Sequence, residues 1–261
     1  MSMLNRKDRR RRKKSQLPVQ TLFETCKDVF ANGGVDFIPP PDHVHRLRSI
    51  LDSLKSDDVD LSPDMPYFRE TRNGRASVIT YLHLYECDKF SMGIFCLPPS
   101  SVLPLHNHPG MTVFSKLLFG TMHIKSYDWV DNVSEVSALT SRASENTALA
   151  AKARLAKLNV NANFVAPCDT SILYPTTGGN MHCFTAVTAC AVFDVLSPPY
   201  SDPDGRHCAY YLEHPFERFS VDGLSVAESE KEEHAWLQER EKPRDLAIVG
   251  ALYRGPKIVL Y

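Results

Sequence analysis

Residues 104–120 read Pro104-Leu-His-Asn-His-Pro-Gly-Met-Thr-Val-Phe-Ser-Lys-Leu-Leu-Phe-Gly120. His106 and His108 stand two positions apart in this stretch, which is otherwise rich in apolar residues. In a β-strand, residues two apart point to the same face with Cα atoms roughly 6.6 Å apart, so both imidazoles can reach one metal ion. Pro109 and Gly110 turn the chain directly afterwards, which places the pair at a strand end, where a site can open to solvent.

A second segment supplies the matching half of this pattern, and it reads Tyr174-Pro-Thr-Thr-Gly-Gly-Asn-Met-His182. Each half alone is a weak signal, because paired histidines on surface strands are common. The combination is the two-part signature of cupin barrels: an H-x-H pair followed by a glycine, here Gly120, and then a P-x-x-G turn that leads into a histidine. The two segments together predict one metal ion bound by His106, His108 and His182.

Short strand-like runs surround these segments, with β-branched and aromatic residues separated by polar turns. They do not alternate with helices, as the strands of a doubly wound sheet would. The pattern therefore predicts a mainly β protein, an antiparallel sandwich or barrel, and with the histidine signature a cupin double-stranded β-helix, or jelly-roll barrel. We expect strands at 77–86, 90–97, 112–118, 121–129, 171–174, 183–195 and 207–212.

Segments before and after these runs predict other elements. Residues 17–34 and 41–54 have helical periodicity, with prolines at their starts. Residues 131–163 look like an insertion in the β-scaffold, and the composition of their middle, residues 143–158, favours a helix. The charged stretch 227–241 is a further helix candidate, and the apolar residues 247–260 are expected to dock back on the domain as part of a C-terminal extension.

The composition is that of a soluble globular protein. The chain has 261 residues, of which 43% are hydrophobic and 23% charged, enough for one sizeable domain at residues 17–261. No apolar stretch is long enough to cross a bilayer, so no membrane partner is expected. Seven cysteines without C-x-x-C spacing indicate neither a disulfide framework nor a zinc ribbon.

The N-terminal head, residues 1–16, is expected to be disordered and strongly basic. Residues 6–14 carry eight positive charges and one negative charge. Such a run fits a nuclear-import signal, a phosphate-binding arm or a solvated tail. Direct nucleic-acid binding is not expected, since no base-reading set of residues surrounds the run. We expect the protein in the nucleus and the cytoplasm, and as a monomer, because nothing in the sequence demands a dimer.

The expected ligands indicate which reactions the metal site can support. Many cupins carry a glutamate three or four residues after the H-x-H pair, but here Met111 and Thr112 occupy those places. Three neutral imidazoles leave a divalent ion its full charge and, in an octahedral arrangement, three open positions for a bidentate substrate and O2. This set suits thiol oxidation, because a metal-bound thiol loses its proton readily.

Residues 95–129 resemble the plant cysteine oxidases, which are relatives of animal cysteamine dioxygenase, and the similarity extends over roughly residues 20–255. Residues 174–184, 192–200 and 206–211 match as well. The resemblance implies an Fe(II)-dependent dioxygenase that uses O2 to convert the N-terminal cysteine of target proteins to the sulfinic acid. In plants such targets include group VII ethylene response factors, whose oxidised terminus is arginylated and leads to degradation, which couples oxygen supply to the hypoxia response.

The resemblance also implies further site residues. Asp194 and Tyr200 match family positions on the substrate side, where a carboxylate could hold the substrate ammonium or orient a ligand. The alternative for Asp194 is a buried acid bonded to nearby backbone amides. Cys208 and Tyr210 form a C-x-Y pair of the kind proposed to make a thioether in the animal relative, and the alternative for Cys208 is a small buried hydrophobe.

The sequence is also compatible with two other functions. One is an oxidase of free cysteine or cysteamine, and the other is a non-catalytic cupin that binds a partner. Metal content and oxygen consumption separate the enzyme from the binding protein, and a comparison of a Cys-initiated peptide with free cysteine separates the two oxidases.

Overall fold

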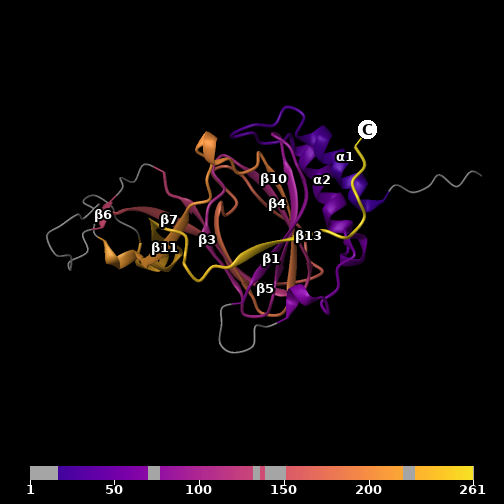
Figure 1. Cartoon of the computed structure of the whole chain (residues 1–261). Coiled ribbons are helices and arrows are strands. Elements are labelled where there is room, and N and C mark those ends of the chain that lie inside the picture. Colours follow the sequence, from indigo (N-terminus) through magenta and orange to yellow (C-terminus); the bar gives the residue numbers. More distant parts are fainter. Residues whose placement is uncertain (1–16, 70–76, 132–135, 139–150, 220–226, 261) are drawn as a thin grey trace, which may run out of the picture.

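Two β-sheets face each other, and two helices cover the outer face of one of them (Figure 1). The structure is a computed structural model that describes residues 17–69, 77–131, 136–138, 151–219 and 227–260. The basic head and residues 132–135 and 139–150 of the expected insertion therefore lie outside the described residues. Among those described, no helix has the length and apolar character needed to span a bilayer.

The first sheet holds six strands, and all its pairings are antiparallel except that of β13 with β1. Their order is β13 (Ile248–Leu252), β1 (Ile79–Glu86), β2 (Ser91–Leu97), β10 (Cys190–Ser197), β4 (Thr112–Phe119) and β8 (Ser171–Leu173). The tail segment expected to dock back thus does so, as the edge strand β13.

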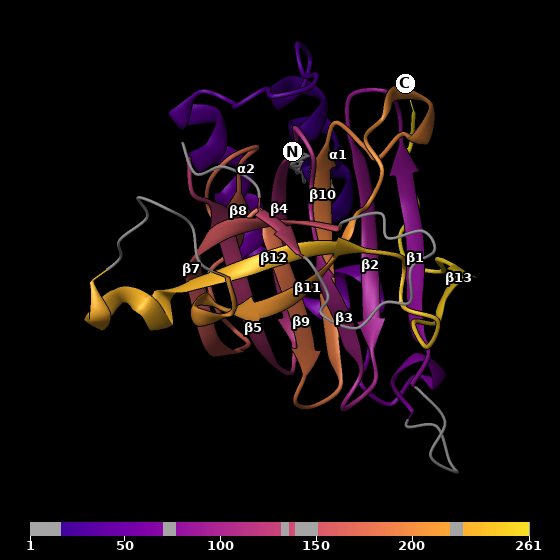
Figure 2. The same cartoon turned by 90° about the vertical axis from the view of Figure 1, so that its left-hand side faces the viewer.

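The second sheet is antiparallel and holds seven strands. Their order is β12 (His234–Arg240), β11 (Tyr210–Pro215), β3 (Val102–His106), β9 (Met181–Ala186), β5 (Thr121–Trp129), β7 (Ala151–Val165) and β6 (Val136–Ala138). Strand β12 also pairs with β7, so the β11–β12 hairpin crosses in front of β3, β9 and β5 (Figure 2). Two facing sheets that are antiparallel apart from the β13–β1 pair are the predicted jelly-roll barrel.

The helices α1 (Pro18–Val29) and α2 (Pro41–Ser53) lie where the sequence predicts them. A proline in the first turn of each suits a position that needs no backbone donor. Phe23 of α1 and Phe30, just after the end of α1, pack on Phe90 next to the first sheet, and their ring centroids lie 6.2 and 6.0 Å from that of Phe90. Short 3-10 turns occupy Ser56–Val59, Pro66–Phe68, Asp202–Asp204, Phe216–Arg218 and Glu228–Glu233.

Strand β10 illustrates how the alternation of side chains divides the two faces of the first sheet. Phe193 and Val195 point outward into the cluster beneath the helices. Val192 points inward, into an apolar cluster shared by both sheets, and Asp194, two residues further along, points inward into the cavity. The barrel interior thus has a packed apolar end and an end that contains polar groups.

Two helix predictions were wrong. Residues 151–158 belong to β7, and residues 234–240 form β12, preceded only by a 3-10 turn. Both segments are rich in helix-forming residues, but pairing with neighbouring strands overrides intrinsic propensity. In β7 the buried Ala153 and Leu155 alternate with the half-buried Arg154, which is a strand period.

Two boundaries also differ from those expected. The predicted strand 183–195 is two strands, β9 and β10, joined by a turn at residues 187–189. The expected insertion at 131–163 overlaps β7, which belongs to the second sheet and pairs with β5 along most of its length.

Candidate metal centre

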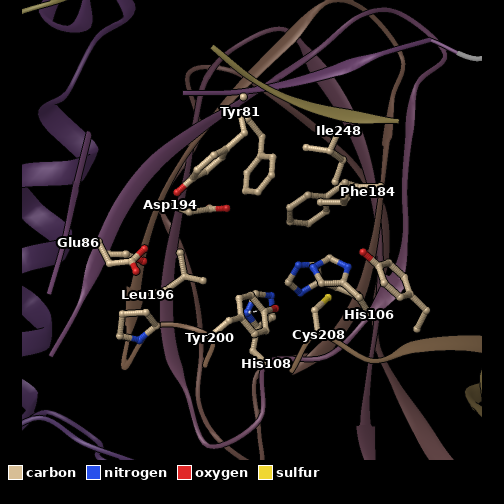
Figure 3. A pocket seen from close by; sticks show the side chains of 17 residues that line it. Tyr81, Glu86, His106, His108, Phe184, Asp194, Leu196, Tyr200, Cys208 and Ile248 are labelled. Carbon is tan, nitrogen blue, oxygen red and sulfur yellow. Dashed lines mark hydrogen bonds between the residues drawn. The ribbon is translucent and has the colours of Figure 1, made fainter. Parts of the chain in front are cut away.

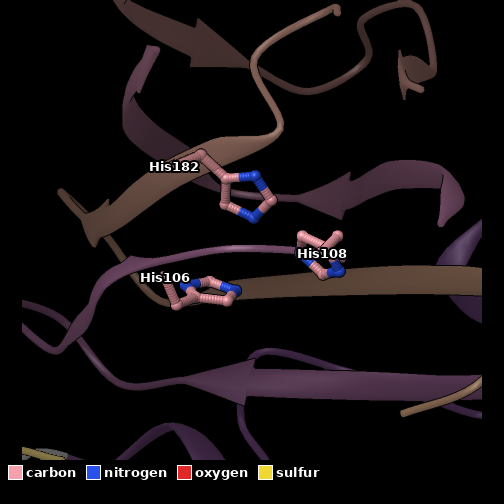
Figure 4. A group of neighbouring side chains, drawn as sticks. All are labelled: His106, His108 and His182. Carbon is pink, nitrogen blue, oxygen red and sulfur yellow. The ribbon is translucent and has the colours of Figure 1, made fainter. Parts of the chain in front are cut away.

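The three predicted metal ligands come together at the polar end of the barrel interior (Figure 4). His106 is the last residue of β3 and pairs in register with His182 of β9, whereas His108 lies just beyond the end of β3. One ring nitrogen from each lies within 4.8 Å of those of the other two, and all three side chains are buried. The ring centroids are 4.6 to 5.1 Å apart.

The hydrogen bonds of the rings settle which nitrogen faces the centre. Nδ1 of His106 lies 2.8 Å from the Pro104 carbonyl, and Nδ1 of His182 lies 3.4 Å from the Gly179 carbonyl. A carbonyl only accepts, so these Nδ1 atoms carry the proton and each Nε2 keeps a free lone pair.

His108 reaches the same state through Tyr200. The Tyr200 hydroxyl donates its one hydrogen to the Asn107 carbonyl at 2.7 Å, so it accepts from Nδ1 of His108 at 2.9 Å. Nε2 of His108 is then a lone-pair donor, and it is buried without a hydrogen-bond partner among the described residues. Buried polar atoms rarely lack a partner, and a metal ion would supply one here.

Burial keeps the three imidazoles neutral. Desolvation lowers the pKa of His106 to about 4. It also lowers the pKa of His108 and of His182 well below the usual value, and repulsion from the neighbouring histidines adds to the effect. Neutral nitrogen donors with free lone pairs fit a divalent transition metal, and the group contains no carboxylate.

The triad forms one end of a cavity of about 370 Å³ (Figure 3). Phe184, from β9, is stacked on His182, with ring centroids 4.4 Å apart. Asp194 and Tyr81 lie across the cavity from the histidines, and Glu86 lies at its side. The space is thus lined by metal-ligand candidates at one end, by acidic and phenolic groups at the other, and by apolar walls between them.

Asp194 is buried and carries an oxygen with no partner. It lies on β10 between Gly93 of β2 and Ser115 of β4. Burial raises the pKa of Asp194 to about 7, and a hydrogen bond from Ser115 lowers it in part. Oδ1 has no hydrogen bond from any described residue. A purely structural acid bonded to backbone amides does not account for this atom.

Tyr200, Cys208 and Tyr210 all line the same cavity. The Cys208 thiol lies within hydrogen-bonding range of both tyrosine hydroxyls, and burial raises its pKa, which keeps it protonated. Cys208 is a free cysteine, and the Tyr210 ring centroid lies 6.4 Å from that of His106. The structure therefore brings the C-x-Y pair to the metal centre, and the thioether stays a prediction.

Sequence reasoning missed several residues of the site. Tyr81 comes from a strand far from both histidine segments, and no local pattern marks it. Asn180 contacts His108, and its position two residues before His182 could have drawn notice. Asp128 lies in the predicted strand 121–129 but contacts the turn before His182, which depends on how the strands pair.

Comparison with known proteins gives a consistent result. The family model PCO_ADO matches residues 50–258. Plant cysteine oxidase 2 of Arabidopsis thaliana is 58% identical over 255 residues, covering 97% of this chain and 88% of that protein. Plant cysteine oxidase 1 of the same organism is 57% identical over 261 residues, covering 95% and 85%. The human 2-aminoethanethiol dioxygenase is 32% identical over 225 residues, covering 84% and 82%. The chain belongs to the PCO_ADO family.

Proposed function

We propose that the protein is an Fe(II)-dependent thiol dioxygenase that converts the N-terminal cysteine of target proteins to cysteine sulfinic acid with O2. The observation that carries the proposal is the group of three buried, neutral imidazoles, one ring nitrogen of each lying within 4.8 Å of those of the other two beside a cavity. The names of its relatives at 57% and 58% identity, plant cysteine oxidases, support cysteine as the substrate.

His106, His108 and His182 would hold the iron. Iron held there would supply the redox chemistry that joins O2 to a thiol. The apolar walls, such as Phe184, keep bulk water from the reacting sulfur. Tyr200 holds His108 in the tautomer that leaves Nε2 free.

Asp194 would orient the substrate. Its unpartnered Oδ1 lies on the wall opposite the histidines, where it can accept a hydrogen bond from the amine of an N-terminal cysteine. Such charge-assisted bonds are shorter and stronger than neutral ones. We assign Asp194 to substrate binding, so its ionised form is the active one.

The charge of the cavity favours an N-terminal cysteine over free cysteine. Among the described residues that line it, Asp194 and Glu86 are acidic, and no lysine or arginine is present. The carboxylate of free cysteine would enter this space beside two acidic groups and without a cationic side chain to pair with, and the proposed iron, which binds the thiol, would be its only cationic neighbour. In an N-terminal cysteine that carboxylate is a neutral amide, so the penalty disappears. Cysteamine also lacks a carboxylate and is the closer competitor.

The cellular role follows from the proposed substrate. We propose that the targets include group VII ethylene response factors, so that oxidation leads to arginylation and degradation through the N-degron pathway and couples oxygen supply to the hypoxia response. For the basic head we propose a nuclear-import signal, with the enzyme acting in the nucleus and cytoplasm as a monomer that does not bind nucleic acid. A fluorescent fusion with residues 6–14 neutralised tests the import signal, and light scattering tests the monomer.

Mass spectrometry of a peptide beginning Cys-Gly-Gly tests the proposed reaction. Iron-loaded enzyme in air should add about 32 Da, two oxygen atoms on sulfur. The same peptide with an N-terminal Ser is the matched control and should not change. Free cysteine and cysteamine, run in parallel, should react more slowly. A peptide that stays unmodified while the protein binds iron would favour the non-catalytic binding protein.

A further inference from the structure

We infer that Asn180 is a positioning residue: its side-chain amide stands in for a missing strand neighbour and fixes His108 in place for metal binding. The inference rests on the metal site proposed above. Asn180 is 5% exposed, and its side chain hydrogen-bonds to the backbone of both His108 and Tyr174.

The ladder between β3 and β9 ends at the metal centre. His106 and His182 are the last registered pair, and an antiparallel ladder that continued in this register would pair residue 108 with residue 180, two positions further along. Strand β3 has ended by then, and β9 has not begun. At this position the N–H of His108 donates to Oδ1 of Asn180 at 3.1 Å, and Nδ2 of Asn180 donates to the His108 carbonyl at 2.8 Å. The side chain thus makes the two bonds that a paired backbone would make.

Only an amide can do this. The second hydrogen on Nδ2 of Asn180 goes to the Tyr174 carbonyl at 2.9 Å, so the group uses two donors and one acceptor. Carbonyl oxygens only accept hydrogen bonds, so the side-chain atom of Asn180 that faces both of them must be the nitrogen, Nδ2. An aspartate in the same place would face two carbonyl oxygens with no hydrogen to give.

The other flank of Asn180 is held in a similar way. The last registered pair of β5 with β9 is Tyr127 with Met181, and Asp128 follows opposite Asn180. The Asp128 carboxylate accepts from the backbone N–H groups of Asn180 and Gly179, each at 2.9 Å. Gly179 has a φ of +84°, a conformation that suits glycine, and its carbonyl faces the His182 ring. The turn before His182 is therefore fixed between two side chains.

His108 depends on this arrangement more than the other two histidines do. His106 and His182 lie within strands, whose ladders fix their backbones. His108 lies outside any strand, so Asn180 sets its backbone and Tyr200 sets its ring. Removal of groups that orient a metal ligand commonly costs 10- to 100-fold in metal affinity.

Substitution of Asn180 tests the inference with Co²⁺ as a spectroscopic probe. Asn180→Asp keeps the shape but loses both donors, and Asn180→Ala removes the group without adding charge. Asn163→Asp makes the same change at an exposed position on β7 and is the matched control. Competition titration should show the Co²⁺ Kd of both Asn180 variants raised about 10- to 100-fold, with an altered Co²⁺ absorption spectrum, and the control unchanged. Circular dichroism of the metal-free proteins confirms that each variant compared is folded.

The outcomes separate this inference from the proposed function. Folded Asn180 variants that bind Co²⁺ with the wild-type Kd and spectrum would overturn the positioning role and leave the metal site standing. Wild-type protein that binds no Co²⁺ would overturn the metal site, and the inference with it. If Asn180→Asp does not fold, Asn180→Ala decides by the same titration, and if both fail, Asp128→Asn does, with a smaller loss expected because it keeps one acceptor oxygen.

Discussion

Strand β10 places Val192 in the apolar part of the barrel interior and Asp194 in the part that contains the cavity, two positions apart on the same face. Around Val192 apolar side chains fill the interior, including Leu97, Leu117 and Met122, and we call this part the closed end. Around Asp194 the interior is open, and a buried carboxylate oxygen has no partner.

The difference shows what the scaffold decides and what the residues decide. Strand alternation determines which side chains point inward at both ends. At the closed end apolar side chains fill that space, and their burial stabilises the fold. At the open end the inward groups are histidines, an acid and phenols, whose burial costs free energy unless something binds them. The first end accounts for stability and the second for function, and each of the following changes tests that division.

The largest effect is expected from His108→Ala. Loss of one of three ligands should reduce metal content sharply and bring oxidation of a Cys-initiated peptide to background, because two neutral imidazoles hold a divalent ion weakly. Metal analysis and peptide mass measure both. His83→Ala removes an exposed histidine on β1 and should leave both unchanged. Wild-type turnover in the His108 variant would show that His108 is not a metal ligand.

Leu117→Ala tests the closed end. Leu117 is 4% exposed in the apolar cluster, so its truncation should lower the free energy of unfolding by about 3 kcal/mol, as measured by urea titration. Metal affinity should stay within about twofold of wild type, because distant sites behave independently. Leu212→Ala, at a position that is 40% exposed, should cost much less. A loss of metal affinity that matched the loss of stability would show that the two ends are coupled.

Asp194→Asn tests the polar wall. Its kcat/KM for the peptide should fall about 100-fold, since a charged hydrogen bond to the substrate amine is lost. The pKa of about 7 belongs to the metal-free chain, and a bound cation would lower it. In the wild type kcat/KM should therefore rise with pH as Asp194 ionises, in a range at or below pH 7. The variant should lack this rise. Full turnover of the variant with an unchanged KM would show that Asp194 has a structural role and does not bind the substrate.

Tyr200→Phe should have the smallest effect. The ring and its packing remain, but Nδ1 of His108 loses its acceptor, so the tautomer that frees Nε2 is no longer favoured. We expect metal affinity to fall about 10-fold, the lower end for loss of a group that orients a ligand. Tyr85→Phe removes a hydroxyl from a ring that packs on Phe23, away from the cavity, and serves as the control. Equal metal affinities in the two variants would contradict the role given to Tyr200.

The sequence predicted the open end better than the elements around it. The H-x-H pair and His182 are local patterns, although the strand that carries His106, β3, was not among the predicted strands and His108 lies outside any strand. By contrast, β7 and β12 are strands because they pair with each other and with the barrel, and their helix-forming composition gives the opposite signal. The contacts of Asn180 and Asp128 depend on strand register, which is set by packing across the whole sheet and so could not be read from spacing.

The most direct test of the central claim is oxidation of the Cys-Gly-Gly peptide by iron-loaded protein under ¹⁸O2. If three histidines bring a thiol and O2 together on one ferrous ion, both oxygen atoms come from the same gas molecule, and the peptide should gain about 36 Da. A peptide that gains no mass, or takes oxygen from water instead, would contradict the account.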